Sequence, residues 1–291
     1  MPATAPARSS WRFDAIGTIW EIESSAALPA DLRAAVDDCI ASFDAEWSRF
    51  RADSLVSRLA AQGGSVPAPR DASDMLGAYA VVADATGGAV NPLIGSSLAN
   101  RGYDAEYSLI DRGAIAAPAD WRSQVTWDDG NLTLGGPALI DVGALGKGRL
   151  VDNIHELLRS AAGPDLVVDA GGDLVAQGAP VRVGLEHPYD PRRAIGVWTV
   201  TDAALCASAV NRRAWGDGLH HVLDARTGAP VRTIAATWAV APSAMIADAV
   251  ATALFFDGGP ALAHDWGVQW VRMSTDGRVE WSPGSKAELF V

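Results

Sequence analysis

An aspartate and a threonine stand four residues apart in an apolar stretch near the carboxyl end of the chain. Asp248 and Thr252 share one face if residues 243–256 form a helix, and most of their neighbours are apolar. A carboxylate among apolar side chains is costly unless it is paired or binds a cation. A hydroxyl one turn later adds a second hard oxygen, and the two together suit Mg²⁺. The alternative is structural, with Thr252 bonded to the carbonyl four residues before it and Asp248 at the surface.

A glycine-rich turn lies upstream, at residues 143–148, where a short apolar run meets an amphipathic one. Three glycines allow unusual backbone angles, and the amides of such a turn can bind phosphate. The spacing to Lys147 differs from that of a P-loop, and the dinucleotide-binding fingerprint is missing, so a plain tight turn is the alternative. A second glycine pair lies within residues 169–173, where acidic residues flank a predicted hairpin turn.

Two adjacent histidines, His220 and His221, precede Asp224. Neighbouring side chains of a strand point to opposite faces, so one of the pair at most faces a given site. A histidine three residues before an aspartate is a candidate for an oriented general base. A Ser-His-Asp triad with Ser208 is the rival, but the chain has no G-x-S-x-G nucleophile elbow. The other histidines are predicted to be structural or solvated: His155, His187 and His264.

The chain is strongly acidic, with 23 Lys and Arg against 35 Asp and Glu and a formal net charge of −12. This balance lacks the basic footprint of a nucleic-acid-binding protein, so no nucleic-acid partner is expected. An anionic ligand then needs a local device: a metal ion, backbone amides or a few placed cations. Cys39 and Cys206 are too few for a disulfide framework and are predicted to be buried thiols.

Residues 1–10 show neither a signal peptide nor a lipobox cysteine. The apolar stretch 235–256 is interrupted by Pro242 and Asp248, which argues against a transmembrane helix. We therefore expect a cytoplasmic protein without a membrane span.

The composition allows a sizeable core, because 49% of the 291 residues are hydrophobic and 20% are charged. Helical periodicity comes early in the chain and strands dominate later, which favours an α+β fold with antiparallel sheets. We predict a flexible N-terminus over residues 1–12 and a single domain over residues 13–291. The predicted helices span residues 29–50, 53–61, 72–86, 149–161 and 243–256, and residues 91–119 are predicted to be irregular. The predicted strands span residues 13–22, 125–134 (a hairpin), 138–142, 166–168, 173–177, 181–186, 195–200, 205–209, 220–223, 238–240, 268–273 and 279–281.

In their order along the chain, these motifs resemble the ApbE family of flavin transferases. Residues 141–152 are similar to the family's D-L-G-G-I-A-K-G-Y-A-V-D, 170–173 to L-G-G-D, 221–228 to H-I-I-D-P-R-T-G and 247–253 to A-D-A-L-S-T-A. Shorter similarities precede them at residues 16–18 (M-G-T), 48–54 (S-x-[YF]-x-x-D-S) and 88–92 (G-A-F-D-P). The resemblance extends over about residues 13–260.

The resemblance implies a T-fold-like architecture of antiparallel sheets flanked by helices. It also implies transfer of FMN from FAD to a Thr or Ser hydroxyl of a target flavoprotein as a phosphoester, with AMP released and Mg²⁺ (or Mn²⁺) required. His221 is then the expected catalytic base. The implied metal ligands are Asp248, Thr252 and the backbone carbonyl of Ala144. The implied FAD contacts are Ile16, Phe50 (stacking on the flavin), Ala89, Val90, Asn91, Asp141, Lys147 and Val222.

The chain also departs from the family pattern. The departures are Ala207 for a usual threonine, Asn91 for a common aspartate, Ile16 for methionine, and Ala251 where some members carry another metal-binding aspartate. The last departure argues against a second metal ion. Three functions fit the sequence: the transferase, an FAD pyrophosphatase that uses water, and a non-catalytic FAD-binding protein. A fourth, a Ser/His hydrolase, is disfavoured.

Overall fold

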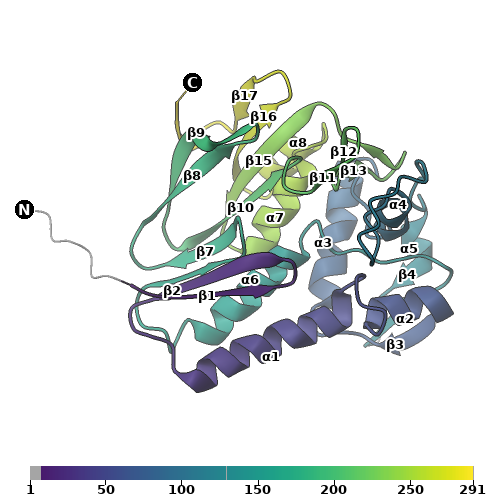
Figure 1. Cartoon of the computed structure of the whole chain (residues 1–291), viewed down its shortest axis with the longest axis horizontal. Coiled ribbons are helices and arrows are strands. Elements are labelled where there is room, and N and C mark those ends of the chain that lie inside the picture. Colours follow the sequence, from purple (N-terminus) through teal and green to yellow (C-terminus); the bar gives the residue numbers. More distant parts are fainter. Residues whose placement is uncertain (1–7, 129, 291) are drawn as a thin grey trace, which may run out of the picture.

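An antiparallel sheet of eight strands forms the centre of the computed structural model, which describes residues 8–128 and 130–290 (Figure 1). Its strands are β1 (Ser9–Ala15), β2 (Thr18–Ser24), β6 (Leu166–Asp169), β7 (Asp173–Gln177), β10 (Ala203–Ala209), β15 (Ile234–Ala241), β16 (Gln269–Ser274) and β17 (Val279–Trp281). They lie side by side in the order β1-β2-β6-β7-β10-β15-β16-β17, and each neighbouring pair is antiparallel.

Helices cover one face of this sheet (Figure 1). On this side lie α1 (Ala30–Trp47), α3 (Ala72–Ala85), α6 (Gly146–Leu158), α7 (Ala244–Ala253) and α8 (Gly259–Asp265), while α2 (Leu55–Gln62), α4 (Gly95–Asn100) and α5 (Trp121–Gln124) lie beside the central sheet rather than on it. Helices α6 and α7 contact each other and the strands, while α1 packs on α6 and α3 packs on α7. In the part of the chain that the structure describes, no helix has both the length and the apolar character needed to cross a membrane.

A three-stranded sheet packs on the opposite face, in the order β18-β9-β8. Its strands are β8 (Val181–His187), β9 (Asp190–Val200) and β18 (Glu288–Leu289). The remaining strands form smaller sheets: β3 (Gly64–Pro67), β5 (Asn131–Leu134) and β4 (Val125–Thr126) together, β11 (Ala214–Trp215) with β12 (Leu219–His220), and β13 (Leu223–Asp224) with β14 (Ala229–Pro230).

Strand β10 shows how the sequence supports both faces of the central sheet. Ala204 and Cys206 are buried in the core beneath the helices, while Leu205 is buried with Trp198 against the second sheet. Successive side chains of a strand alternate between faces, and a strand covered on both faces is apolar throughout. The result is a three-layer arrangement of helices, central sheet and small sheet.

The predicted α+β class with antiparallel sheets is confirmed. The five predicted helices form within three residues of their expected bounds, as α1, α2, α3, α6 and α7, and β7 and β17 have the bounds that we predicted. The hairpin predicted over residues 125–134 is present as β4 and β5. Of the predicted buried thiols, Cys206 is buried and Cys39 is half-buried, and both are free.

The prediction of one strand over residues 13–22 is wrong. The segment holds parts of β1 and β2, joined by a tight turn at Ile16 (φ 42°) and Gly17 (φ 73°). Positive φ angles at both turn residues match the twist of a two-residue hairpin. A β-branched residue such as Ile16 rarely adopts a positive φ, so the sequence does not indicate a turn at this position. Strand β1 begins at Ser9, within the segment predicted to be flexible, while residues 1–7 lie outside the described residues.

Three further expectations about secondary structure are wrong, and helix α8 was missed. Residues 138–142 form no strand, and fully buried Ile140 packs in the core beside the helices. Residues 220–223 divide between β12 and β13, which pair with different partners. The segment 91–119 contains helix α4, and helix α8 was not predicted.

Helix α6 begins at Gly146 rather than at the predicted residue 149, and within it Gly148 packs closely against α7. A Cβ atom placed on Gly148 would collide with the carbonyl of Ala244 and lie 2.8 Å from the Asp248 Cβ. The absence of a side chain at Gly148 therefore lets the two helices approach closely at the position of Asp248.

Replacing this glycine should destabilise the protein markedly. We expect Gly148→Ala to lower the free energy of unfolding by about 3 kcal/mol, because the added methyl group meets backbone atoms that cannot move aside. The matched control is Gly77→Ala in α3, where a Cβ meets nothing within 4 Å. That variant should gain about 0.5–1 kcal/mol from helix propensity alone. Urea unfolding measures both, and equal stabilities of the two variants would contradict the close-approach account.

Candidate active site

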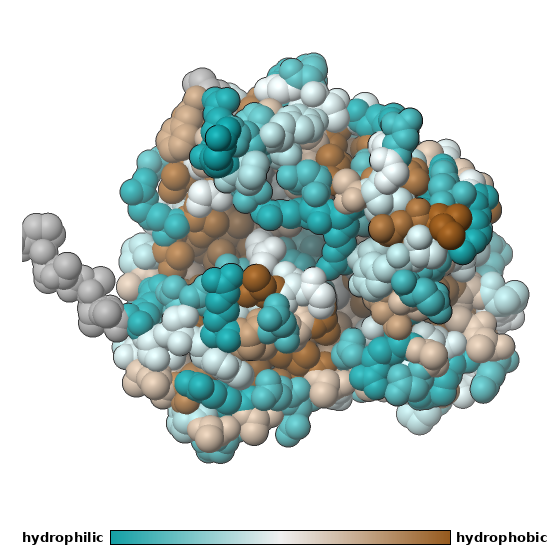
Figure 2. Space-filling view, in the orientation of Figure 1, coloured by the Kyte–Doolittle hydropathy of each residue, from teal (hydrophilic) through white to brown (hydrophobic). Residues whose placement is uncertain are grey.

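One cavity of about 770 Å³ collects the residues that the sequence analysis singled out. Figure 2 shows the molecule hollowed near its centre, between the β1–β2 hairpin and the part that carries α4. All twelve predicted site residues line this cavity: Ile16, Phe50, Ala89, Val90, Asn91, Asp141, Ala144, Lys147, His221, Val222, Asp248 and Thr252. Segments far apart in the sequence therefore meet around one space large enough for a dinucleotide.

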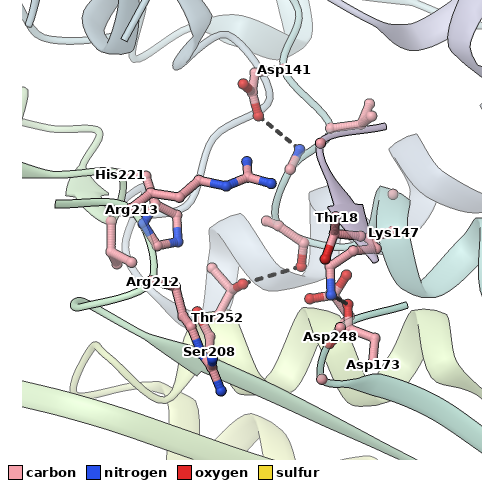
Figure 3. Close-up of a pocket in the computed structure, with 18 of the residues that line it drawn as sticks. Thr18, Asp141, Lys147, Asp173, Ser208, Arg212, Arg213, His221, Asp248 and Thr252 are labelled. Carbon is pink, nitrogen blue, oxygen red and sulfur yellow. Dashed lines mark hydrogen bonds and ion pairs between the residues drawn. The ribbon is translucent and has the colours of Figure 1, made fainter. Parts of the chain in front are cut away.

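Three oxygen groups meet where α7 passes the turn before α6. The Thr252 hydroxyl donates to the Ala144 carbonyl at 3.2 Å (Figure 3). The Asp248 Oδ2 accepts the Gly148 N–H at 3.0 Å. The structural alternative is wrong, because Asp248 is 6% exposed and Thr252 bonds across to Ala144 rather than back along its own helix.

The fold holds these groups in place through two further contacts. Asp152 of α6 accepts the N–H groups of Ala244 and Met245 at 2.7 and 2.9 Å, and so caps the first turn of α7. The buried Tyr79 hydroxyl donates to the Asp141 carbonyl at 3.0 Å and accepts the Ala144 N–H at 3.3 Å. The backbone at Ala144 is thus fixed from two sides.

The electrostatics of this region favour a bound cation. Burial, together with the nearby Asp173 carboxylate, raises the pKa of Asp248 well above its usual value. Lys147 forms an ion pair with Asp173 and donates to the Ala170 carbonyl at 3.1 Å. Burial opposes the charge of Lys147, but Asp173 and Asp248 outweigh it and raise the pKa of the ammonium group. The lysine pairs directly with Asp173, and Asp248 forms no ion pair among the described residues.

A hard divalent cation fits the donor set of one carboxylate, one hydroxyl and one backbone carbonyl. The described residues contain no group of three or more His, Cys, Asp or Glu side chains arranged as a metal centre, so any metal here depends on the neutral oxygens as well. The two oxygens of Asp173 are buried without a well-aligned hydrogen bond, which adds negative potential beside the set.

His221 lies in the wall of the same cavity (Figure 3). Burial and the Arg213 guanidinium lower the pKa of the imidazole to about 4, so the ring is neutral at pH 7. Its Nδ1 is buried without a hydrogen-bond partner. The expectation that Asp224 orients this ring fails, because the Asp224 carboxylate instead binds the backbone and guanidinium of Arg226.

The cavity has an aromatic end. The Phe50 ring stacks on Tyr107 with centroids 5.2 Å apart, and Tyr103 meets Phe50 edge-on at 5.2 Å. The Arg49 guanidinium lies 4.1 Å from the Phe50 ring centre and donates to Asp141 at 2.5 Å. Asp141 also accepts the Gly143 N–H at 2.7 Å. The Asp141 carboxylate therefore lines the cavity and also holds the Arg49 side chain and the Gly143 backbone in position.

The loop that carries Ala89, Val90 and Asn91 also lines the cavity. The Asn91 side chain accepts from Leu93 N–H at 2.9 Å and donates to the Pro118 carbonyl at 2.8 Å, so it shapes its loop. The Ala89 carbonyl accepts the Ala225 N–H at 3.0 Å. This last bond brings the loop around Ala89 beside the end of β13, which begins one residue after Val222.

Sequence reasoning missed several side chains that complete the site: Arg49, Tyr79, Tyr103, Tyr107, Asp152 and Arg213. Arg49 adjoins Phe50 within a motif that was matched, so its basic charge was a usable signal. Asp173 was assigned only to a hairpin turn, which is present, but its pairing with Lys147 was not foreseen.

A cavity of this size, with oxygen donors at its base and a neutral imidazole in its wall, is typical of an enzyme that acts on a large ligand. The model of the ApbE family matches residues 16–270. The chain belongs to the ApbE family.

Similarity to individual proteins agrees with this assignment. An FAD:protein FMN transferase from Treponema pallidum (strain Nichols) is 29% identical over 92% of this chain and 85% of its own length. A second, from Rhodobacter capsulatus, is 27% identical over 98% of this chain, which spans 59% of that relative's length. The prediction of a transferase enzyme is thus confirmed.

Solved structures confirm the fold. The ApbE protein from Thermotoga maritima superposes with a TM-score of 0.83 at 23% identity, covering 94% of this chain and 97% of that one. The flavin transferase ApbE from Vibrio cholerae gives a TM-score of 0.79 at 21% identity, covering 96% and 98%.

The raised pKa of Asp248 has a consequence for stability. We expect Asp248→Asn to raise the free energy of unfolding of the metal-free protein at pH 7 by about 1 kcal/mol or more, because folding of the parent moves an ionisable carboxyl into surroundings that raise its pKa. The gain should shrink as the pH falls and should vanish below about 4, where the carboxyl group of the parent is protonated in the unfolded as well as in the folded state.

The matched control is Asp38→Asn on the exposed face of α1, which should change stability by less than about 0.5 kcal/mol. Denaturant unfolding in the presence of a chelator makes the comparison. A large loss of stability in Asp248→Asn would show that the carboxylate is a structural anchor instead.

Proposed function

We propose that this protein transfers FMN from FAD to a Thr or Ser hydroxyl of an acceptor flavoprotein, with Mg²⁺ bound and AMP released. The observation that carries the proposal is the meeting of the Ala144 carbonyl, the Thr252 hydroxyl and buried Asp248 in the cavity that also holds neutral His221. The names of the relatives support FAD as donor and a protein as acceptor.

The proposed reaction exchanges one phosphorus–oxygen bond for another. The acceptor hydroxyl oxygen bonds to the phosphorus of the FMN half, and the bond from that phosphorus to the bridging oxygen breaks. AMP departs with the bridging oxygen, and the hydroxyl proton is released. A phosphoester to the acceptor results, with no net oxidation or reduction.

His221 suits the removal of that proton. A neutral imidazole accepts a proton, whereas a charged one cannot, and burial keeps this ring neutral at physiological pH. Its Nδ1 is free of competing hydrogen bonds among the described residues. We assign it the role of general base.

Asp248, Thr252 and the Ala144 carbonyl would hold Mg²⁺, with Mn²⁺ as a substitute of the same hard-oxygen preference. The ion would neutralise charge on the diphosphate as the bond breaks. The cluster of Phe50, Tyr103 and Tyr107 offers aromatic rings against which an isoalloxazine ring could pack, with the Phe50 ring itself covered by Tyr107 and Arg49. The loop at Ala89, Val90 and Asn91 and the turn at Ile16 would complete the contacts with FAD.

The proposal predicts a covalent product. The purified protein, incubated with FAD, Mg²⁺ and a peptide or domain carrying an S/T-G-A-T-like acceptor, should yield the FMN-modified acceptor and an equal amount of AMP by mass spectrometry. Asp248→Ala should lose at least about 10²-fold in rate. FMN and AMP without modified acceptor would instead establish an FAD pyrophosphatase. Bound FAD without turnover would establish a non-catalytic flavin-binding protein.

The pH dependence tests His221 separately. Because the neutral form is the active base, kcat/KM should fall only as the pH drops through about 4 and should be level between about pH 6 and 8. His221→Ala should cost about 10²-fold or more and should remove this acid limb. The control is His264→Ala on the exposed side of α8. An unchanged pH–rate profile in His221→Ala would reject the base assignment.

A further inference from the structure

The basic side chains that line the cavity differ in whether a carboxylate neutralises them. The neutralised ones are Arg49 with Asp141, Lys147 with Asp173, and Arg212 with Glu186. Arg213 differs, since the hydrogen-bond partner of its guanidinium in the described chain is the uncharged Tyr103 hydroxyl. In a protein with a net charge of −12, a cation without a carboxylate partner gives the ligand cavity a local positive charge that can attract an anion.

The Arg213 guanidinium is held in position although it is exposed. It lies 5.7 Å from the centre of the Tyr103 ring, which is itself buried and stacks on Trp215 at 5.6 Å. A Cβ on Gly17 would lie 3.9 Å from Arg213 Nη2, so the guanidinium reaches toward the β1–β2 turn across the cavity. Arg12 on β1 also lacks a carboxylate partner, but no hydrogen bond or ring contact among the described residues fixes its side chain.

Arg213 also lies beside the proposed base. The backbone N–H of His221 donates to the backbone carbonyl of Arg213 at 3.2 Å, next to the pairing of β11 with β12. Figure 3 shows the Arg213 side chain passing the His221 ring and extending toward the middle of the cavity. A fixed positive charge thus lies at the place where an attacking hydroxyl would lose its proton.

We propose that Arg213 donates hydrogen bonds to the diphosphate oxygens of the flavin dinucleotide and places that group against His221. The proposal rests on the transferase function above and adds a binding residue to its site. Guanidinium groups bind phosphate through paired N–H donors, remain charged at every accessible pH and are bound to aromatic faces, as Arg213 is here. Arg213 immediately precedes β11 and so brings a positive charge to that side of the cavity. The proposed metal ligands Asp248 and Thr252 lie on α7.

Flavin fluorescence can measure the binding of FAD and of riboflavin, which lacks phosphate, to the parent and to Arg213→Gln in the presence of Mg²⁺. We expect Arg213→Gln to weaken FAD binding about 10- to 100-fold while riboflavin binding is unchanged. Arg213→Lys keeps the charge but not the paired donors, so its FAD affinity should lie between those of the parent and of Arg213→Gln. The control is Arg278→Gln, an exposed arginine outside the cavity that is paired with Glu280 and should leave both affinities unchanged.

Two results would overturn the proposal. Unchanged FAD binding in Arg213→Gln would show that the guanidinium does not contact the diphosphate. An equal loss for FAD and riboflavin would show that Arg213 acts through the Tyr103 ring instead. The underlying function is separable, because a parent that binds FAD but modifies no acceptor defeats the transferase proposal and leaves the binding comparison intact.

Discussion

The burial of the Asp248 carboxylate where α6 meets α7 is the constraint on which the site depends. The two helices approach because Gly148 has no side chain, and the Gly148 amide then donates to Asp248 at 3.0 Å. Asp152 caps α7 from the same side of α6. A buried carboxylate with one amide partner is costly. The fold accepts this cost at a position that faces the cavity, which is the pattern expected of a group kept for a ligand.

Charge pairing around the cavity follows from the same constraint. Lys147 is the nearest cation to the acidic group, but its ion pair with Asp173 leaves Asp248 without one. An acidic chain cannot bind a diphosphate through general electrostatic attraction, so the attraction must be local. A metal ion bound by Asp248, Thr252 and the Ala144 carbonyl would supply part of this local attraction. The guanidinium of Arg213 would supply the rest from another wall of the cavity.

Periodicity and motif order predicted the fold class, five of the helices and many of the residues that line the cavity. They succeeded because helix faces and strand alternation are local properties, as α7 shows with Asp248 and Thr252 on one side. Features that depend on tertiary contact were missed. Ile16 adopts a positive φ that its own chemistry disfavours, and Ile140 is buried without a strand partner. Arg213 becomes meaningful only when Tyr103 and His221 are brought beside it. That residues 13–291 form a single domain stays a prediction.

The central claim is that Asp248 is kept buried in order to bind a divalent cation. Calorimetric titration of Mg²⁺ into the FAD-bound protein tests it most directly, with Asp248→Asn as the comparison. The account predicts saturable binding of close to one ion per chain in the parent and none in Asp248→Asn, with the variant still folded and still binding the flavin. Equal Mg²⁺ affinity in the two proteins would contradict it.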